Sequence, residues 1–382
     1  EDVLSAVIDA PDAAPLPATP TSAVAPETVA QAVEILKTAQ RPLIICGGSQ
    51  WDAATGQAAA EIARRLGAPV AVTFRRQDYV DNDHPNYAGD LGVGMNPALG
   101  ARLSDADAVL LLGAELNDVT TREFTLLDPA APPRIVQVAP DGDALSKHYP
   151  AEVAIIADPR DAVGALLAAL ADADGEDRGA KDARAAYESW QAPQATPGAV
   201  RMEEVVTHMA RTLPHQTIVT NGAGNYAAFL HRYYRFRQFG TQAAPTSGSM
   251  GYGLPAAVAA KLAHPDRPVV CLAGDGCLQM TIQELSTARQ YGAEIIVIIA
   301  NNGRYGTIRM HQEKHYPGRV SGTELFNPDY VALAGAYGGT GHLVQDMAAF
   351  EAALTAGLQG GLHLIELRLD RQMLSTTASL PG

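Results

Sequence analysis

The sequence predicts an α/β protein with two doubly wound, parallel-sheet domains, and three observations point to this class. The chain has 382 residues, more than the roughly 100–200 residues of an ordinary domain, so two compact units are expected. Apolar residues make up 47% of the chain and charged residues 18%, a composition typical of buried parallel strands. Short apolar runs alternate with stretches of helical periodicity, and this βα alternation predicts parallel sheets.

The first domain is expected over residues 26–172. Residues 1–25 are rich in proline and alanine, which predicts an extended linker before it. A helical pattern covers residues 26–37, and the apolar run at residues 43–46 ends at Gly47-Gly48, as a buried strand does. Further strands are expected at residues 70–74, 108–112, 135–138 and 153–156, and further helices at residues 58–66 and 161–170.

The second domain is expected over residues 200–382. Residues 173–199 mix charges with alanine, glycine and proline, which predicts a second linker. Strands are then expected at residues 217–220, 269–273, 295–300 and 362–369. Helices are expected near residues 201–213, 255–263, 282–291, 328–337 and 348–358.

Charge and cysteine usage narrow the classes of function. A net charge of −14 argues against a nucleic-acid or anionic-membrane partner and favours a small molecule. Cys46, Cys271 and Cys277 lack metal-ligand spacing, so they are interpreted as small apolar side chains. The chain shows neither a signal-peptide pattern nor an apolar stretch of about 18 residues, so no membrane contact and a cytoplasmic location are expected.

Polar residues follow two strands of the second domain at the point where each is expected to end. Gly274-Asp275-Gly276 follows residues 269–273, and Asn301-Asn302 follows residues 295–300. The carboxyl ends of neighbouring parallel strands meet at one edge of a sheet, so Asp275 and Asn302 should lie close together. Their oxygens, with the backbone carbonyl of Arg304, suit Mg²⁺, which usually completes its coordination with phosphate oxygens and water. The pattern therefore predicts a magnesium site that holds a diphosphate.

Gly-Asp-Gly or Asn-Asn-Gly alone is a common turn, but the two together at this spacing resemble the signature of thiamine diphosphate (ThDP)-dependent enzymes. Residues 247–257 are similar to a segment that passes under the cofactor in acetolactate synthases and benzoylformate decarboxylases. Residues 221–226 resemble a second diphosphate-contacting loop. The cofactor contacts that the resemblance implies are Gly224, Asn225, Ser249, Met250, Gly251, Gly274, Asp275, Gly276, Cys277, Asn302, Arg304, Tyr305 and Gly306.

Two of these contacts also have an ordinary structural explanation. In the family, a bulky apolar residue at the position of Met250 supports the bent cofactor, whereas simple core filling would also explain a methionine there. Asn225 could equally be an ordinary helix cap.

The first domain resembles the central domain of the same family, which carries FAD in some members and a nucleotide in others. Gly113–Asp118 stands where flavin-binding members have an Arg-Phe-Asp-like sequence, and the missing arginine argues against FAD. Gly47-Gly48-Ser49 and Gly92-Val93-Gly94 could serve a nucleotide, but glycine turns at strand ends are ordinary in such folds.

The family has three domains in the order pyrimidine-binding, central and diphosphate-binding, and this chain resembles only the last two. The resemblance implies that the absent N-terminal pyrimidine domain carries the glutamate that activates the cofactor, so no residue here is assigned that role. We therefore expect a truncated product, or a subunit whose pyrimidine domain is a separate chain, with little turnover in isolation. A homodimer or homotetramer is expected, since the family builds its sites between subunits.

The function that the resemblance implies is acetolactate synthase-like decarboxylation of 2-keto acids with carboligation. Ile308 stands where pyruvate-decarboxylase-type enzymes have a proton-donating glutamate, which favours carboligation. A benzoylformate decarboxylase-like activity stays open because residues 302–306 are also similar to that enzyme, and a non-catalytic ThDP- and magnesium-binding module is the alternative of another class. His311 is the candidate catalytic residue, in a basic run that could hold a substrate carboxylate or move a proton, and a solvated loop is the competing interpretation.

Overall fold

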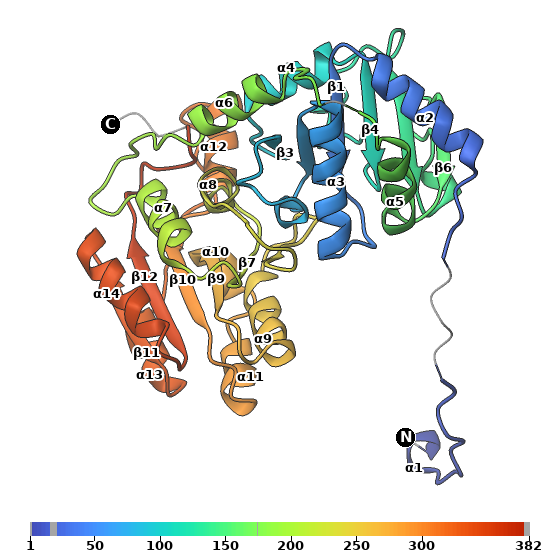
Figure 1. The fold of residues 1–382 in the computed structure, drawn as a ribbon. Helices are drawn as coiled ribbons and strands as arrows, with labels where there is room; N and C mark the ends of the chain where they lie inside the picture. The colour runs from blue at the N-terminus through green and yellow to red at the C-terminus, as the bar shows by residue number, and fades with distance from the viewer. Residues whose placement is uncertain (1, 16–20, 174, 378–382) are drawn as a thin grey trace.

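The computed structural model describes residues 2–15, 21–173 and 175–377. They form two α/β units, each built on a six-stranded parallel sheet (Figure 1). The short helix α1 (Asp2–Ser5) is exposed and lies apart from both units (Figure 1). Parts of the two expected linkers, namely residues 1, 16–20 and 174, lie outside the described residues, as do residues 378–382 at the end of the second expected domain.

The first sheet has the strand order β3-β2-β1-β4-β5-β6, and every neighbouring pair is parallel. The strands are β1 (Pro42–Cys46), β2 (Val70–Thr73), β3 (Tyr87–Leu91), β4 (Ala108–Leu112), β5 (Arg134–Ala139) and β6 (Val153–Ile156). One face is covered by α2 (Pro26–Thr38), α3 (Ala53–Leu66) and α5 (Pro159–Ala169), and the other by α4 (Pro97–Asp105) and α6 (Ala180–Trp190). The 3₁₀ turns η1 (Gln77–Tyr79) and η2 (Gly142–Ala144) lie in connections.

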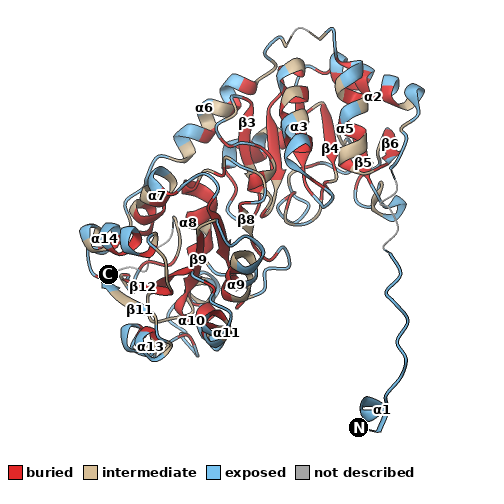
Figure 2. Ribbon diagram, turned by 60° about the horizontal axis from the view of Figure 1, so that its bottom comes forward, coloured by how far each residue is buried: buried red, intermediate tan, exposed pale blue. Residues whose placement is uncertain are grey.

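The second sheet has the strand order β11-β12-β10-β9-β7-β8 and is also parallel throughout. Its strands are β7 (Ile218–Asn221), β8 (Gln242–Ala243), β9 (Val269–Gly274), β10 (Ile296–Asn301), β11 (Thr340–Val344) and β12 (His363–Arg368). On one face lie α7 (Met202–Thr212), α8 (Tyr226–Tyr233) and α14 (Met347–Gly357), and on the other α9 (Gly253–Ala263), α11 (Glu284–Gln290) and α13 (Tyr330–Ala336). The buried central strands between exposed helix faces are visible in Figure 2.

The predicted fold class, two doubly wound parallel-sheet units, is confirmed. The structure differs from the sequence expectation in three additional strands, β3, β8 and β11. It also has helices outside the expected ranges, namely α1, which lies in the segment expected as an extended linker, and α4, α6, α8, α10 (Asp275–Gln279) and α12 (Gly306–His315). Helix α6 lies inside the segment expected as a linker, where it packs against β3 and α4, so part of that segment belongs to the first unit.

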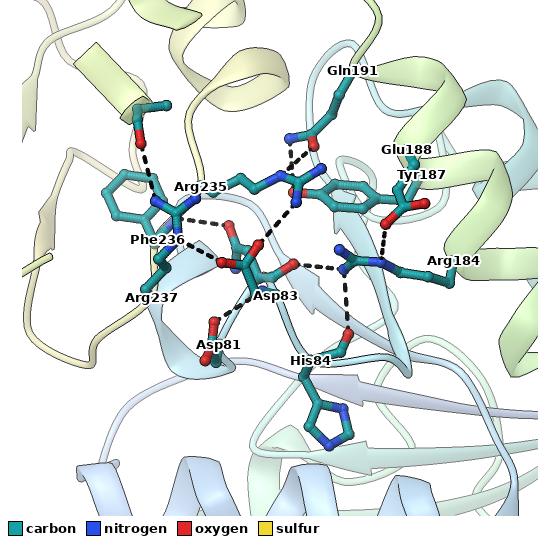
Figure 3. Close-up of polar contacts among 12 residues, drawn as sticks. Asp81, Asp83, His84, Arg184, Tyr187, Glu188, Gln191, Arg235, Phe236 and Arg237 are labelled. Carbon is teal, nitrogen blue, oxygen red and sulfur yellow. Dashed lines mark hydrogen bonds and ion pairs between the residues drawn. The ribbon is translucent and has the colours of Figure 1, made fainter. Parts of the chain in front are cut away.

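The two units are joined by the segment from Arg75 to Asp83, which follows β2. Asp83 pairs with Arg235 (Oδ1 to Nη1, 2.9 Å) and with Arg237 (Oδ2 to Nε, 2.5 Å), both of which follow α8 in the second unit (Figure 3). Arg235 also donates to Gln191, just after α6, at 2.7 Å (Figure 3). Asp83 and Gln191 therefore both bind the second unit to the first.

Within the described ranges, every helix is too short or too polar to cross a lipid bilayer.

Candidate functional site

The candidate site lies at the carboxyl ends of β9 and β10. These strands are neighbours, and Ala300 pairs with Gly274 in their register. Because both chains leave the sheet at the same edge, Asp275 and the Asn301-Asn302 pair come together as the sequence predicts. Asp275 is the first residue of α10, directly after β9.

The Asp275 carboxylate is buried, with 3% of its surface exposed, and it accepts hydrogen bonds only from neutral N–H groups among the described residues. Its Oδ1 accepts from its neighbour Gly276 at 2.9 Å, and its Oδ2 accepts from Gly303 N at 2.9 Å and from Asn327 Nδ2 at 2.8 Å. Burial raises the pKa of this carboxyl, and the three hydrogen bonds only partly oppose the effect. A buried carboxylate in these surroundings favours a cation.

Three asparagines order the oxygens around Asp275. Asn327 bridges Asp275 and Asn301, since its Nδ2 also lies 2.8 Å from Asn301 Oδ1. Asn301 in turn donates to Glu366 on the adjacent strand β12, at 2.7 Å. The Asn302 amide donates to Met373 O at 3.3 Å, which leaves its oxygen directed toward the backbone N–H of Arg304 at 3.3 Å.

This donor set suits a hard cation. Among the residues that the structure describes, His, Cys, Asp and Glu side chains form no group of three or more that could hold a metal. Asp275 and Asn302 offer oxygen atoms to the same pocket, and Mg²⁺ characteristically takes one or two protein carboxylates and fills its other positions with phosphate and water oxygens. The residues present therefore fit magnesium bound together with an anionic phosphate ligand.

A pocket opens at this sheet edge. Its lining consists of Ala223, Gly224, Asn225, Tyr226, Met250, Gly274, Asp275, Gly276, Cys277, Ala300, Asn302, Arg304, Tyr305, Gly306, Thr307, Ile308, Leu369, Met373 and Leu374. The lining includes glycine segments, which expose backbone, and apolar side chains.

The structure brings most of the sequence-predicted contacts into this lining. They are Gly224, Asn225, Met250, Gly274, Asp275, Gly276, Cys277, Asn302, Arg304, Tyr305 and Gly306. Ser249 and Gly251 do not line the pocket. Ser249 is exposed and its hydroxyl bonds Met250 O at 3.2 Å, whereas Gly251 is buried and its N–H donates to Cys277 Sγ at 3.1 Å.

Two glycines of the motif are enforced by close packing. A Cβ on Gly276 would lie 2.5 Å from Cε1 of Tyr305, and one on Gly274 would lie 2.8 Å from Cδ1 of Tyr226. Such contacts are too short for carbon atoms, so a side chain at either position would displace an aromatic wall of the pocket.

His311 lies outside the pocket lining. It is exposed on α12, and its ring stacks on that of His315 one turn later, with centroids 6.1 Å apart. Arg309 points elsewhere, because it is buried and pairs with Glu313 at 2.6 Å. The structure thus places the predicted basic run on the helix after the site, and it does not bring His311 to the candidate metal edge.

Sequence reasoning missed the segment after β12. Leu369, Met373 and Leu374 line the pocket, and Asn225 Nδ2 donates to Leu374 O at 2.7 Å. Asn327 was also missed. These residues carry no motif or spacing signal, since their position depends on the chain folding back over the sheet edge.

A separate pocket opens at the carboxyl edge of the first sheet. Its lining is formed by Gly48, Thr73, Phe74, Arg76, Gly113, Glu115, Asn117, Val119, Thr120 and Thr246. The loops after β1 and β4 touch here, because a Cβ on Gly48 would lie 2.1 Å from Gly113 O. Gly92-Val93-Gly94 takes no part in this lining, and binding of FAD or a nucleotide stays a sequence prediction.

Comparison with known proteins assigns family models to both units. Residues 29–166 match the model described as thiamine pyrophosphate enzyme, central domain. Residues 222–367 match the model described as thiamine pyrophosphate enzyme, C-terminal TPP binding domain. The second match contains the Asp275 and Asn302 edge.

Three curated relatives show the extent of the similarity. The acetolactate synthase large subunit of Parasynechococcus marenigrum (strain WH8102) is 31% identical over 342 residues, which cover 87% of this chain and 54% of that protein. The acetolactate synthase large subunit of Haemophilus influenzae (strain ATCC 51907 / DSM 11121 / KW20 / Rd) is 27% identical over 359 residues, 90% of this chain and 61% of the relative. The sulfoacetaldehyde acetyltransferase of Alcaligenes xylosoxydans xylosoxydans is 28% identical over 379 residues, 90% of this chain and 63% of the relative. The chain therefore spans less than two thirds of the length of these relatives.

Proposed function

We propose that this chain, which belongs to the thiamine pyrophosphate enzyme family, binds ThDP together with Mg²⁺ at the Asp275 and Asn302 edge and serves 2-keto-acid decarboxylation with carboligation. The observation that carries the proposal is the buried Asp275 carboxylate, which lines a pocket beside further oxygen ligands and has only neutral hydrogen-bond partners among the described residues. The relatives named acetolactate synthase support the choice of reaction.

Different residues of the pocket would bind the metal ion and the diphosphate. Asp275, the Asn302 side chain and the carbonyl of Arg304 would hold the magnesium ion, and the glycine segments at Gly224 and Gly276 would let backbone amides approach the diphosphate. When bound, the thiazolium ring supplies an electron sink for the carbanion left by decarboxylation.

Met250, Ile308 and Leu374 form an apolar wall of the pocket and offer no proton there. Ile308, whose aliphatic side chain cannot protonate a carbanion, lies at the position where the resemblance implies a glutamate in pyruvate-decarboxylase-type enzymes. This wall supports reaction with a second keto acid over release of an aldehyde, and it disfavours the benzoylformate decarboxylase-like alternative.

The acid–base group is expected from outside this pocket. Among the described lining residues none is histidine or glutamate. We therefore propose that the activating glutamate is supplied by a pyrimidine-binding domain, either within a homo-oligomer or on a separate chain. The same observation favours a second candidate, a ThDP- and magnesium-binding module that is inactive by itself.

Calorimetric titration of ThDP, with and without Mg²⁺, tests the binding proposal. The parent chain should bind ThDP in a magnesium-dependent manner, and Asp275→Ala should weaken that binding at least about a hundredfold, because it removes the one carboxylate proposed for the cation. Asp266→Ala is the matched control, since Asp266 is exposed in the turn after α9. Absence of binding by the parent, or binding by Asp275→Ala equal to the parent's, would refute the proposal.

Product analysis with pyruvate separates the two candidate functions once binding is established. Acetolactate formation supports the carboligating enzyme, and acetaldehyde alone supports a simple decarboxylase. A chain that binds ThDP and Mg²⁺ but does not turn over pyruvate even when a pyrimidine-binding domain is supplied supports the binding module.

A further inference from the structure

Arg75 of the first unit enters the second unit directly behind the cofactor pocket. It follows β2 and is 4% exposed, and its backbone takes the left-handed conformation with φ of 60°. Its Nη2 donates to Gly222 O at 3.1 Å and its Nη1 donates to Pro245 O. A non-glycine residue in this region of φ costs conformational energy and persists where its surroundings demand it.

The charge of Arg75 is not neutralised by a side chain. Among the residues that the structure describes, it forms no ion pair, and its buried Nε has no hydrogen-bond partner. The guanidinium lies over the ring of Phe74, with 4.5 Å between Cζ and the ring centroid. Burial lowers the pKa of Arg75, yet an arginine stays protonated in proteins, so a positive charge remains inside the molecule.

The two carbonyls that Arg75 binds belong to segments that form the pocket. Gly222 directly precedes the lining residues Ala223 to Asn225, and Pro245 precedes the stretch that leads to Met250. A Cβ on Gly222 would lie 2.3 Å from Cys277 Sγ and 3.0 Å from the hydroxyl of Tyr226, and both of these side chains line the pocket. The guanidinium is thus one layer of atoms behind the pocket wall.

We propose that Arg75 is a positioning residue for the cofactor diphosphate: its charge attracts the anion through the pocket wall, and its two carbonyl bonds fix the loops that contact it. The inference rests on the proposed function and extends it, because it makes the first unit a contributor to a site formed by residues of the second. The Arg75 charge can act on the diphosphate through the pocket wall because protein screens a charge less than water does.

The test compares variants that differ in charge while each can still donate a hydrogen bond. Arg75→Gln is neutral, and Arg75→Lys keeps the charge. Arg76→Gln is the control, because Arg76 is the adjacent residue and bonds Gly48 O in the first unit at 2.9 Å. Each chain is titrated calorimetrically with thiamine monophosphate and with ThDP in the presence of Mg²⁺, after thermal unfolding has shown that it folds.

We expect Arg75→Gln to weaken ThDP binding about tenfold to a hundredfold and thiamine monophosphate binding less, because the loss should grow with ligand charge. Arg75→Lys should stay within about threefold of the parent, and Arg76→Gln should match the parent. Equal losses for both ligands, equal losses in the Gln and Lys variants, or failure of both variants to fold would assign Arg75 a purely structural role and overturn the inference. If the parent itself binds no ThDP, the proposed function fails instead.

Discussion

At the scale of single residues, two buried charges mark the site more clearly than its motifs do. Asp275 and Arg75 both lie within or directly behind the pocket wall, and neither has an oppositely charged partner among the described residues. A protein tolerates an isolated buried charge poorly unless a ligand completes it. A magnesium diphosphate supplies both missing charges at once, since the cation suits Asp275 and the anion suits Arg75.

The raised pKa of Asp275 gives magnesium binding a predictable pH dependence. A proton and the cation compete for this carboxylate, and burial raises its pKa above the ordinary value of 3.8. Mg²⁺ affinity should therefore fall as pH is lowered, beginning at a higher pH than for an exposed carboxylate. Titration of Mg²⁺ in the presence of ThDP, carried from neutral pH down through the range in which carboxylates titrate, measures this, and an affinity that does not fall would contradict the assignment of Asp275 as a ligand.

At the scale of elements, strands with an apolar run were predictable, including the edge strand β6, whereas the other three edge strands were not. β1 and β4 are apolar runs buried along their whole length, and their predicted positions agree with the structure. β3 contains Gly89, with φ of 111°, and Asp90, so its sequence carries no apolar run. β11 and β8 are the edge strands of the second sheet. β11 is largely exposed or half-buried, and β8 has only two residues. Their strand pairing is set by tertiary contacts with a neighbouring strand.

The site was predictable to the same extent. Asp275 and Asn302 follow buried strands, so strand order alone brings them together. Leu374 reaches the pocket, and Asn327 reaches Asp275, from irregular segments, and no periodicity fixes where such segments lie. The strand ends that carry Asp275 and Asn302 could therefore be predicted from the sequence, whereas the positions of Leu374 and Asn327 could not.

Helix α5 offers a test of local helix energetics apart from the site. Gly164 lies within it, exposed, and an added Cβ would meet no atom within 4 Å. Gly164→Ala should raise the free energy of unfolding by about 0.5–1 kcal/mol, because alanine loses less backbone entropy on folding. Urea denaturation measures the change. A decrease in stability would show that Gly164 meets a partner or a strain absent from this structure.

At the scale of the whole molecule, the two units are connected through residues that differ sharply in burial. Asn82 is fully buried and its amide bonds Gln77 O, Val80 O and the N–H of Phe236 across the junction. Asp83, next to it, pairs with two arginines at a position where 41% of its side chain is exposed (Figure 3). Asn82 should therefore contribute more to the free energy of unfolding than the ion pairs of Asp83 do.

Asn82→Ala should lower the free energy of unfolding by about 2–4 kcal/mol, since it leaves several buried backbone groups unpaired. Asp83→Ala should cost at most about 1 kcal/mol, because solvent screens its ion pairs. Urea denaturation of both variants at equal ionic strength measures the difference. A larger loss in Asp83→Ala would mean that the ion pairs, and not the buried amide, dominate the junction.

The central claim is that one cation joins the ends of β9 and β10 to a cofactor diphosphate, and crystallography with Mn²⁺ in place of Mg²⁺ tests it most directly. Crystals grown with ThDP and Mn²⁺ should show an anomalous-scattering peak within coordination distance of Asp275 and of the Asn302 side-chain oxygen, with diphosphate density beside Gly224 and Gly276. ThDP density in another pocket, or a bound cofactor with no anomalous peak between Asp275 and Asn302, would contradict the account.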